Sequence, residues 1–128
     1  MILGVFTDAA NVAETHMAPV VLATIPKNIL LPSGVPLIGD RGYDSDPLRE
    51  TLWELGFDLL APHRKNRIKP SVNDGRKMRR YSHRYIVERT NSWLHSFRRV
   101  VTRFERSIGS YDGFVSLACA FIALNKLL

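Results

Sequence analysis

Three short apolar runs alternate with two amphipathic stretches in the first half of the chain. The runs cover residues 2–7, 35–39 and 57–61, and their length is typical of buried strands. Between them, one helix is expected from a cap at Asn11 to about Thr24. Asp46 and Pro47 predict the start of a second helix, which ends near Leu55. This alternation of strands and helices predicts an α/β layer fold.

The second half of the chain has no further strand pattern. Residues 63–80 form a basic stretch with proline and glycine, which indicates a loop. Helices are expected at about 81–97 and 111–128. The apolar side of the 81–97 helix should pack on the sheet. Because three strands are few for a sheet with helices on its faces, we expect an N-terminally incomplete sheet flanked by helices, within one domain of residues 1–128.

The charge of the chain is concentrated in one block. The 128 residues carry a net charge of +6, but residues 64–106 alone hold 14 Lys and Arg against three acids. Such a block is typical of a protein that binds nucleic acid, and a solvated basic face is the alternative. One cysteine, Cys119, excludes a disulfide framework. The longest apolar stretch, 113–124, is about half of the ~20 residues that a membrane span needs, so we expect a cytoplasmic protein with no membrane contact.

Two carboxylates are candidates for chemistry. Asp40 ends the second apolar run, where α/β proteins often present functional groups, although a turn-capping role is an equal alternative. Glu88 lies on the polar side of its helix, four residues after Arg84, where a surface ion pair is the alternative. Together they could hold Mg²⁺ for phosphodiester chemistry. A third carboxylate is expected, but turns and caps already explain Asp8, Asp44 and Asp46.

Two segments carry a family resemblance. Residues 37–45, Leu-Ile-Gly-Asp-Arg-Gly-Tyr-Asp-Ser, resemble the second-Asp motif of bacterial insertion-sequence DDE transposases of the insertion-sequence four/five type. Residues 84–90, followed by Trp93-Leu94, Arg98-Arg99 and 104–106, resemble the Glu motif of the same enzymes. Ala10-Asn11-Val12 is similar to a segment that they carry between the first and second Asp. The likeness covers nearly the whole chain in the right order.

The resemblance implies an RNase H-like fold and a two-metal site, with Mg²⁺ or Mn²⁺, that cuts and joins double-stranded DNA at transposon ends. It makes Asp40 the second metal ligand and Glu88 the third. Tyr81 and Arg84 would grip phosphate, while His95 stands where the family has lysine. The residues expected to contact DNA are Tyr81, Arg84, Arg89, His95, Arg98, Arg99, Arg79 and Arg80.

The first Asp of the family is the main departure. The family places it on a strand before the Ala-Asn-Val segment, so Asp8 is not assigned to this role. The chain therefore resembles the C-terminal part of a DDE catalytic domain. A homodimer on DNA in the bacterial nucleoid is a further expectation. The alternative is a catalytically inactive DNA-binding remnant, and dependence on a divalent metal separates the two hypotheses.

Overall fold

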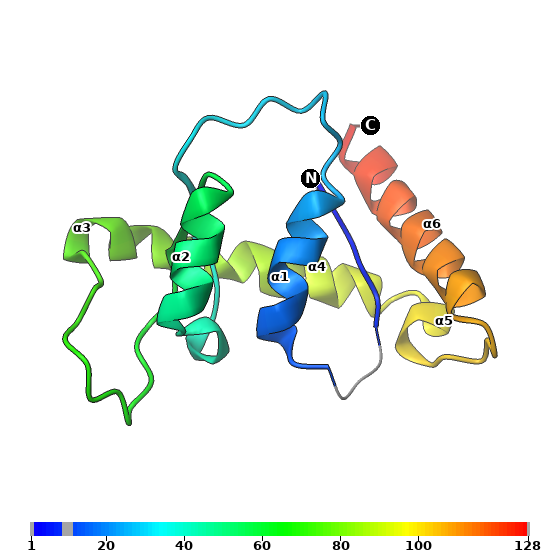
Figure 1. The fold of residues 1–128 in the computed structure, drawn as a ribbon. Coiled ribbons are helices and arrows are strands. Elements are labelled where there is room, and N and C mark those ends of the chain that lie inside the picture. The colour runs from blue at the N-terminus through cyan, green and yellow to red at the C-terminus, as the bar shows by residue number, and fades with distance from the viewer. Residues whose placement is uncertain (1, 9–11, 128) are drawn as a thin grey trace.

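The computed structural model describes residues 2–8 and 12–127 (Figure 1). Within them, helices dominate and one small sheet lies in the first half of the chain. Asn11, the predicted helix cap, lies outside the described residues. The elements in chain order are α1 (Glu14–Ala23), β1 (Val35–Ile38), the 3-10 helix η1 (Arg41–Tyr43), α2 (Asp46–Glu54), β2 (Phe57–Leu60), α3 (Gly75–Met78), the 3-10 helix η2 (Arg79–Arg84), α4 (Tyr85–Leu94), α5 (Arg98–Val101) and α6 (Ile108–Leu127).

The unit β1–α2–β2 confirms the α/β prediction for the middle of the chain. Strands β1 and β2 are parallel, and Val35 pairs with Phe57 at the start of the register. Parallel neighbours need a crossover connection, which α2 supplies. Helix α2 ends next to Gly56, whose φ of +86° lies in the left-handed region that favours glycine. The local signals for two strands and a helix are therefore sufficient here.

A small apolar core lies between α2 and β2. Its buried members are Leu48 and Leu52 of α2 with Leu59 and Ala61 at the end of β2. Helix α1 adds partly buried side chains from the other side, and it lies beside α2 in Figure 1. Leu55, which follows the last residue of α2, is 52% exposed. The core is thus centred on Leu52, which is fully buried.

The edge of β2 that faces away from β1 is covered by a side chain. Leu60 accepts a hydrogen bond from the Gly39 amide, so its carbonyl points towards β1. The carbonyls of Leu59 and Ala61 point the other way, and the Arg49 guanidinium donates to both, at 2.6 and 3.0 Å. Exposed edges invite pairing with other chains. Arg49 therefore occupies acceptors that a further strand would use.

The predicted strand at residues 2–7 is wrong. This segment is extended but has no strand partner among the described residues, and the sheet there contains only β1 and β2. It lies beside α1 instead, where a Cβ on Gly4 would come within 2.9 Å of the Val21 carbonyl. At its other end, the Thr7 hydroxyl donates to Asp112 of α6. A strand needs a neighbouring strand to pair with its backbone hydrogen-bonding groups. Residues 2–7 instead contact helices α1 and α6.

The helices of the second half differ from the prediction in their bounds. Residues 75–80, expected to be loop, form α3 and the start of η2, and the expected 81–97 helix is divided between η2 and α4. Helix α4 has no buried residue and packs on α6 and η2, so its expected burial against the sheet is wrong. Just beyond α4, Phe97 stacks on Phe121 of α6 with ring centroids 6.4 Å apart. The sheet is too small to cover this part of the chain.

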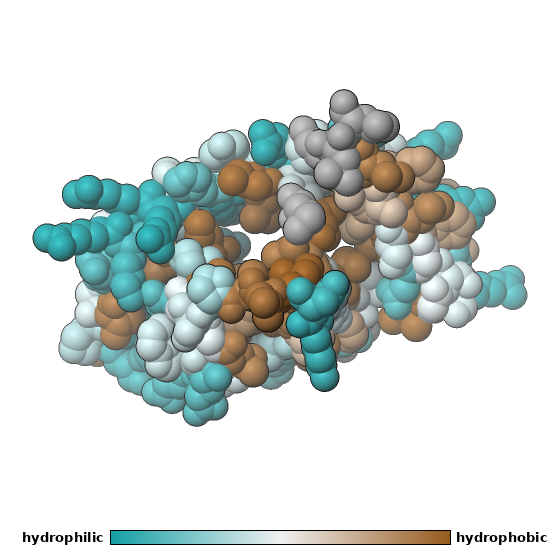
Figure 2. Space-filling view, turned by 90° about the horizontal axis from the view of Figure 1, so that it is seen from above, coloured by the Kyte–Doolittle hydropathy of each residue, from teal (hydrophilic) through white to brown (hydrophobic). Residues whose placement is uncertain are grey.

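Helix α6 is apolar around most of its surface. Over residues 108–125 it is the one described segment that could cross a membrane by length and composition, with a mean hydropathy of 1.3 and 17% of its residues buried. Leu117, Phe121 and Leu124 are about half exposed. Packed helices of soluble proteins pass the same test, so the absence of a membrane segment stays a prediction. Figure 2 shows further hydrophobic residues around a hollow near the middle of the face seen from above.

Replacement of Leu52 by alanine should destabilise the fold by about 3 kcal/mol, because a fully buried leucine leaves a cavity. Urea unfolding followed by circular dichroism measures this change. Leu55→Ala, at the exposed residue directly after α2, is the matched control and should stay within about 0.5 kcal/mol. Equal effects of the two substitutions would show that α2 does not pack through Leu52.

Candidate active site at the end of strand β1

Asp40 follows β1 and caps the turn that comes after it. Its Oδ1 accepts a hydrogen bond of 2.7 Å from the Gly42 amide, and the Tyr43 amide donates to its backbone carbonyl. A Cβ on Gly42 would lie only 2.9 Å from Asp40 Oδ1, so glycine permits this close approach. The turn-capping role is therefore real. It engages one carboxylate oxygen and is compatible with metal ligation by the other.

Glu88 projects from the first turn of α4. Its side chain is 64% exposed, and its Oε1 lies 3.4 Å from Nη2 of Arg84, four residues earlier. The surface ion pair is therefore present as well. An exposed pair of this kind contributes little to stability. Glu88 is accordingly open to a ligand.

Arg84 connects the two candidate carboxylates. The hydroxyl of Tyr81 accepts a hydrogen bond of 3.1 Å from Arg84 Nη1 and is the largest cause of a raised Arg84 pKa. The negative charges of Glu88 and Asp40 raise the pKa of Arg84 further. Strand β1 and η2 also contact each other. Tyr81, Arg84 and Glu88 are thus in direct contact, while Asp40 acts on Arg84 through its charge.

The donors at this place are of the type that binds magnesium or manganese. Both are carboxylates, which such hard cations prefer, and neither is buried. Among residues 2–8 and 12–127, no group of three or more His, Cys, Asp or Glu side chains could hold a metal ion. Asp40 and Glu88 therefore have the donor chemistry that two ligands of a larger set would need.

Several predicted DNA contacts are exposed around this region. Arg79 and Arg80 lie on η2, Arg98 begins α5, and His95 follows the end of α4, all at the surface. All four belong to the basic block of residues 64–106. Their contact with DNA stays a prediction.

Two other predicted contacts are held by aromatic rings. The guanidinium of Arg89 lies over the rings of Tyr85 and Trp93, 5.7 and 5.1 Å from their centroids. Arg99 lies 4.8 Å from the Phe114 centroid and donates to Glu105 at 2.7 Å. Such cation–π contacts fix long side chains at a surface. Both arginines are thus preorganised, although Arg99 already has an anionic partner.

A cluster around Asp44 is the feature that the sequence patterns did not reveal. The Asp44 side chain is 2% exposed and accepts hydrogen bonds from the Arg49 guanidinium at 3.1 Å and the Arg64 amide at 2.8 Å. The imidazole of His63 lies 3.0 Å from the same carboxylate, and Arg67 lies 3.4 Å away. The basic residues directly after β2 were the signal available for it.

This network sets the protonation of Asp44. Burial by itself would raise the pKa, but the hydrogen bonds from the Arg64 amide, His63 and Arg49 outweigh it and lower the pKa to about 2. Asp46, expected as a helix cap, is instead the first residue of α2. A hydrogen bond from Arg67 lowers its pKa, with Lys69 contributing. Both aspartates are engaged by basic side chains of the fold.

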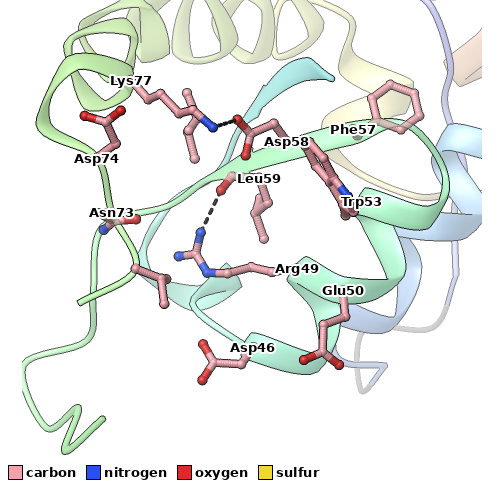
Figure 3. A pocket seen from close by; sticks show the side chains of 12 residues that line it. Asp46, Arg49, Glu50, Trp53, Phe57, Asp58, Leu59, Asn73, Asp74 and Lys77 are labelled. Atoms are coloured by element: carbon pink, nitrogen blue, oxygen red, sulfur yellow. Dashed lines mark hydrogen bonds and ion pairs between the residues drawn. The ribbon is translucent and has the colours of Figure 1, made fainter. Parts of the chain in front are cut away.

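An open groove of about 470 Å³ lies between α2, β2 and residues 72–77 (Figure 3). Trp53 borders it with 61% of its surface exposed, and Lys77 reaches across it to Asp58 at 2.7 Å. Its lining includes neither Asp40 nor Glu88. The groove is therefore distinct from the candidate active site.

Comparison with known proteins decides the family. Residues 1–123 match the family described as the transposase DDE domain. The chain belongs to this family. The resemblance of the Asp40 and Glu88 segments to bacterial insertion-sequence DDE transposases is thereby confirmed at the level of the family.

Two relatives of this DDE-domain chain are proteins assigned as transposases of insertion sequences. One, for element IS402 of Burkholderia cepacia, is 34% identical over 98% of the chain. The other, for element IS6501 of Brucella ovis (strain ATCC 25840 / 63/290 / NCTC 10512), is 32% identical over 70% of the chain. The matched part of the chain spans 58% of the length of the first relative and 67% of the length of the second. No solved structure matches it.

Asp44→Asn should destabilise this DDE-domain chain by about 2 kcal/mol at pH 7, the free energy that corresponds to a pKa lowered from 3.8 to about 2. Because the folded pKa is the lower one, this stabilisation is present above pH ~4 and is lost as the pH falls towards 2. Urea unfolding at several pH values should give a flatter acid dependence for the variant. Glu54→Gln, an exposed change on α2, should reproduce the wild-type curve; identical curves for Asp44→Asn would contradict the network.

Proposed function

We propose that this chain is the C-terminal part of the catalytic domain of an insertion-sequence transposase, which cleaves and transfers DNA strands at the ends of the element. Asp40 and Glu88 would be the second and third acidic metal ligands. The observation that carries this proposal is the match of residues 1–123 to the transposase DDE domain, with Asp40 directly after β1 and Glu88 in the first turn of α4. Arg84, which pairs with Glu88 and whose pKa Asp40 also raises, supports the assignment of both carboxylates to one site.

Each residue at this place has a role that its chemistry allows. The carboxylates of Asp40 and Glu88 would hold Mg²⁺ or Mn²⁺, and such ions, when bound, stabilise the attacking and leaving oxygens of a phosphodiester. Arg84, with the Tyr81 hydroxyl beside it, would bind a DNA phosphate. An arginine fork matches phosphate geometry and stays charged at any physiological pH. Its ion pair with Glu88 would bring that phosphate close to the proposed metal ligand.

Double-stranded DNA is the partner that the basic block favours. Arg79, Arg80, Arg89, Arg98 and Arg99 would contact its phosphates, and His95 would contribute a further contact. Phosphate contacts position a protein on a duplex without reading its sequence. The complete protein would act in the bacterial cytoplasm at the nucleoid, as a homodimer on the transposon ends.

An RNase H-like sheet larger than the two described strands belongs to the same proposal. Strand β1 has one strand neighbour in the described part of the chain, residues 2–7 have none, and hydrophobic residues surround a hollow between elements (Figure 2). The first relative extends beyond the match, since the chain spans 58% of its length. Strands from a further segment of this kind would pair with these edges and bury that surface. They would also supply the first acidic ligand. Residues 1–128 would then be one part of a single domain.

The catalytic proposal can be tested by plasmid nicking with the complete transposase, the protein encoded by the whole gene in which residues 1–128 lie. Nicking should require Mg²⁺ or Mn²⁺ and should fall below detection in Glu88→Gln, because the amide is a poor ligand for a hard cation. Glu50→Gln, an equally conservative change at an exposed position of α2, is the control and should nick normally. Nicking that persists in Glu88→Gln would remove Glu88 from the site.

Binding of the 128-residue chain to duplex DNA tests the basic block separately from catalysis. Affinity should fall with salt, and each phosphate that the chain neutralises should add about −0.9 to the slope of log affinity against log salt. Arg80→Gln should therefore make the slope shallower by about 0.9, whereas Lys27→Gln, outside the block, should leave it unchanged. Fluorescence anisotropy at several salt concentrations gives both slopes. Binding with nicking absent from the native gene product would favour the inactive remnant.

A further inference from the structure

The turn that presents Asp40 is short and closed at both ends. Asp40 opens it, the 3-10 helix η1 follows, and Asp44 closes it with an amide that donates to the Arg41 carbonyl at 3.3 Å. Within it, the Gly42 amide donates to the Asp40 carboxylate. Any displacement of Gly42 therefore moves the hydrogen bond that orients Asp40.

A single arginine from the segment after β2 holds the middle of this turn. Nε of Arg64 donates to the Arg41 carbonyl at 3.1 Å, and its Nη2 donates to the Gly42 carbonyl at 2.6 Å. The fork of the guanidinium thus spans two consecutive carbonyls of η1. The backbone amide of the same residue donates to Asp44 at 2.8 Å. Arg64 consequently grips the turn at three points from 20 or more positions away.

Asp44 and Arg64 differ in their exposure to solvent, and this difference distinguishes a residue that stabilises the fold from one that orients the turn. Asp44 is buried and serves the core of the network, but Arg64 is exposed and its guanidinium contacts the turn. Exposed polar contacts add little to global stability. What they can do is restrict the backbone that carries a ligand, and partners of this kind commonly tune metal affinity.

We infer that Arg64 is a positioning residue for Asp40: its two hydrogen bonds to the turn hold Gly42, and through it the Asp40 carboxylate, in the orientation that receives the metal ion. Asp44 anchors the end of the same turn. This inference rests on the proposed function of Asp40 as a ligand. Arg64 itself touches neither metal nor DNA in this role.

The test uses the ¹⁵N-labelled 128-residue chain and Mn²⁺ alone, whose paramagnetism broadens amide signals near its site. In Arg64→Gln the Gly42 amide should lose its protection from hydrogen exchange, and Mn²⁺ should broaden it with roughly tenfold weaker affinity. The melting temperature should be unchanged. Arg76→Gln, an exposed change outside the cluster, is the control. Arg64 is preferred to Asp44 for this test, since Asp44 variants are expected to unfold more easily.

The outcomes separate this inference from the proposed function. If Asp40→Asn leaves the broadening of Gly42 unchanged, the metal role of Asp40 fails. If Asp40→Asn abolishes the broadening but Arg64→Gln binds Mn²⁺ as tightly as the wild type, Arg64 does not position Asp40. Hydrogen exchange of Gly42 needs no metal, and an unchanged rate in Arg64→Gln overturns the inference by itself.

Discussion

The cost of burying one negative charge organises the middle of this chain. The Asp44 side chain is almost completely excluded from water, and an unpaired carboxylate in that position would be strongly destabilising. Its partners come from α2, through Arg49, and from the segment after β2, through His63 and the Arg64 amide. Each partner residue also makes a hydrogen bond to backbone elsewhere: Arg49 to Leu59, Arg64 to Gly42 and His63 to Val72. The buried charge therefore connects the turn after β1 to α2 and to the segment after β2.

Arg49 shows how this constraint reaches the sheet. The same guanidinium that pairs with Asp44 donates to two carbonyls at the open edge of β2, while its Nε is a buried nitrogen with no hydrogen-bond partner in the described structure. A planar fork with several donors can do this, whereas the single ammonium of lysine could not. The fixed place of the β2 end also fixes His63 and Arg64, which follow it. The sheet edge and the candidate active site are therefore stabilised by connected contacts.

Elements that depend on interactions between residues close in sequence were predictable, and elements that depend on distant residues were not. β1, α2 and β2 were predictable because short apolar runs, Pro47 and Gly56 act locally. Residues 2–7 have the same local pattern, yet a strand also needs a neighbour, and the helices occupy that place. The polar side of the expected 81–97 helix was identified, but the first part is a 3-10 helix, which hydrophobic periodicity does not distinguish.

For the candidate site, motif likeness pointed to Asp40, Glu88, Tyr81 and Arg84, and the structure shows contacts among the last three. The Asp44 cluster joins residues five to 23 positions apart, and no periodic or capping pattern links such positions. Each of its members has an ordinary local explanation as a turn residue or a loop cation. Only the fold shows that they share one carboxylate. Long-range polar networks are thus the part of this site that sequence patterns could not reveal.

The charge of Arg84 acts on both candidate carboxylates: Arg84 pairs with Glu88 of α4, and Asp40, after β1, also raises its pKa. Like charges at short range disfavour each other's ionised forms, and a neighbouring cation offsets that repulsion. Arg84 interacts with both, and its exposed ion pair with Glu88 is weak enough for another cation to replace. Asp40 and Glu88 would hold a divalent ion whose charge offsets theirs. Arg84 would then be available to bind a DNA phosphate.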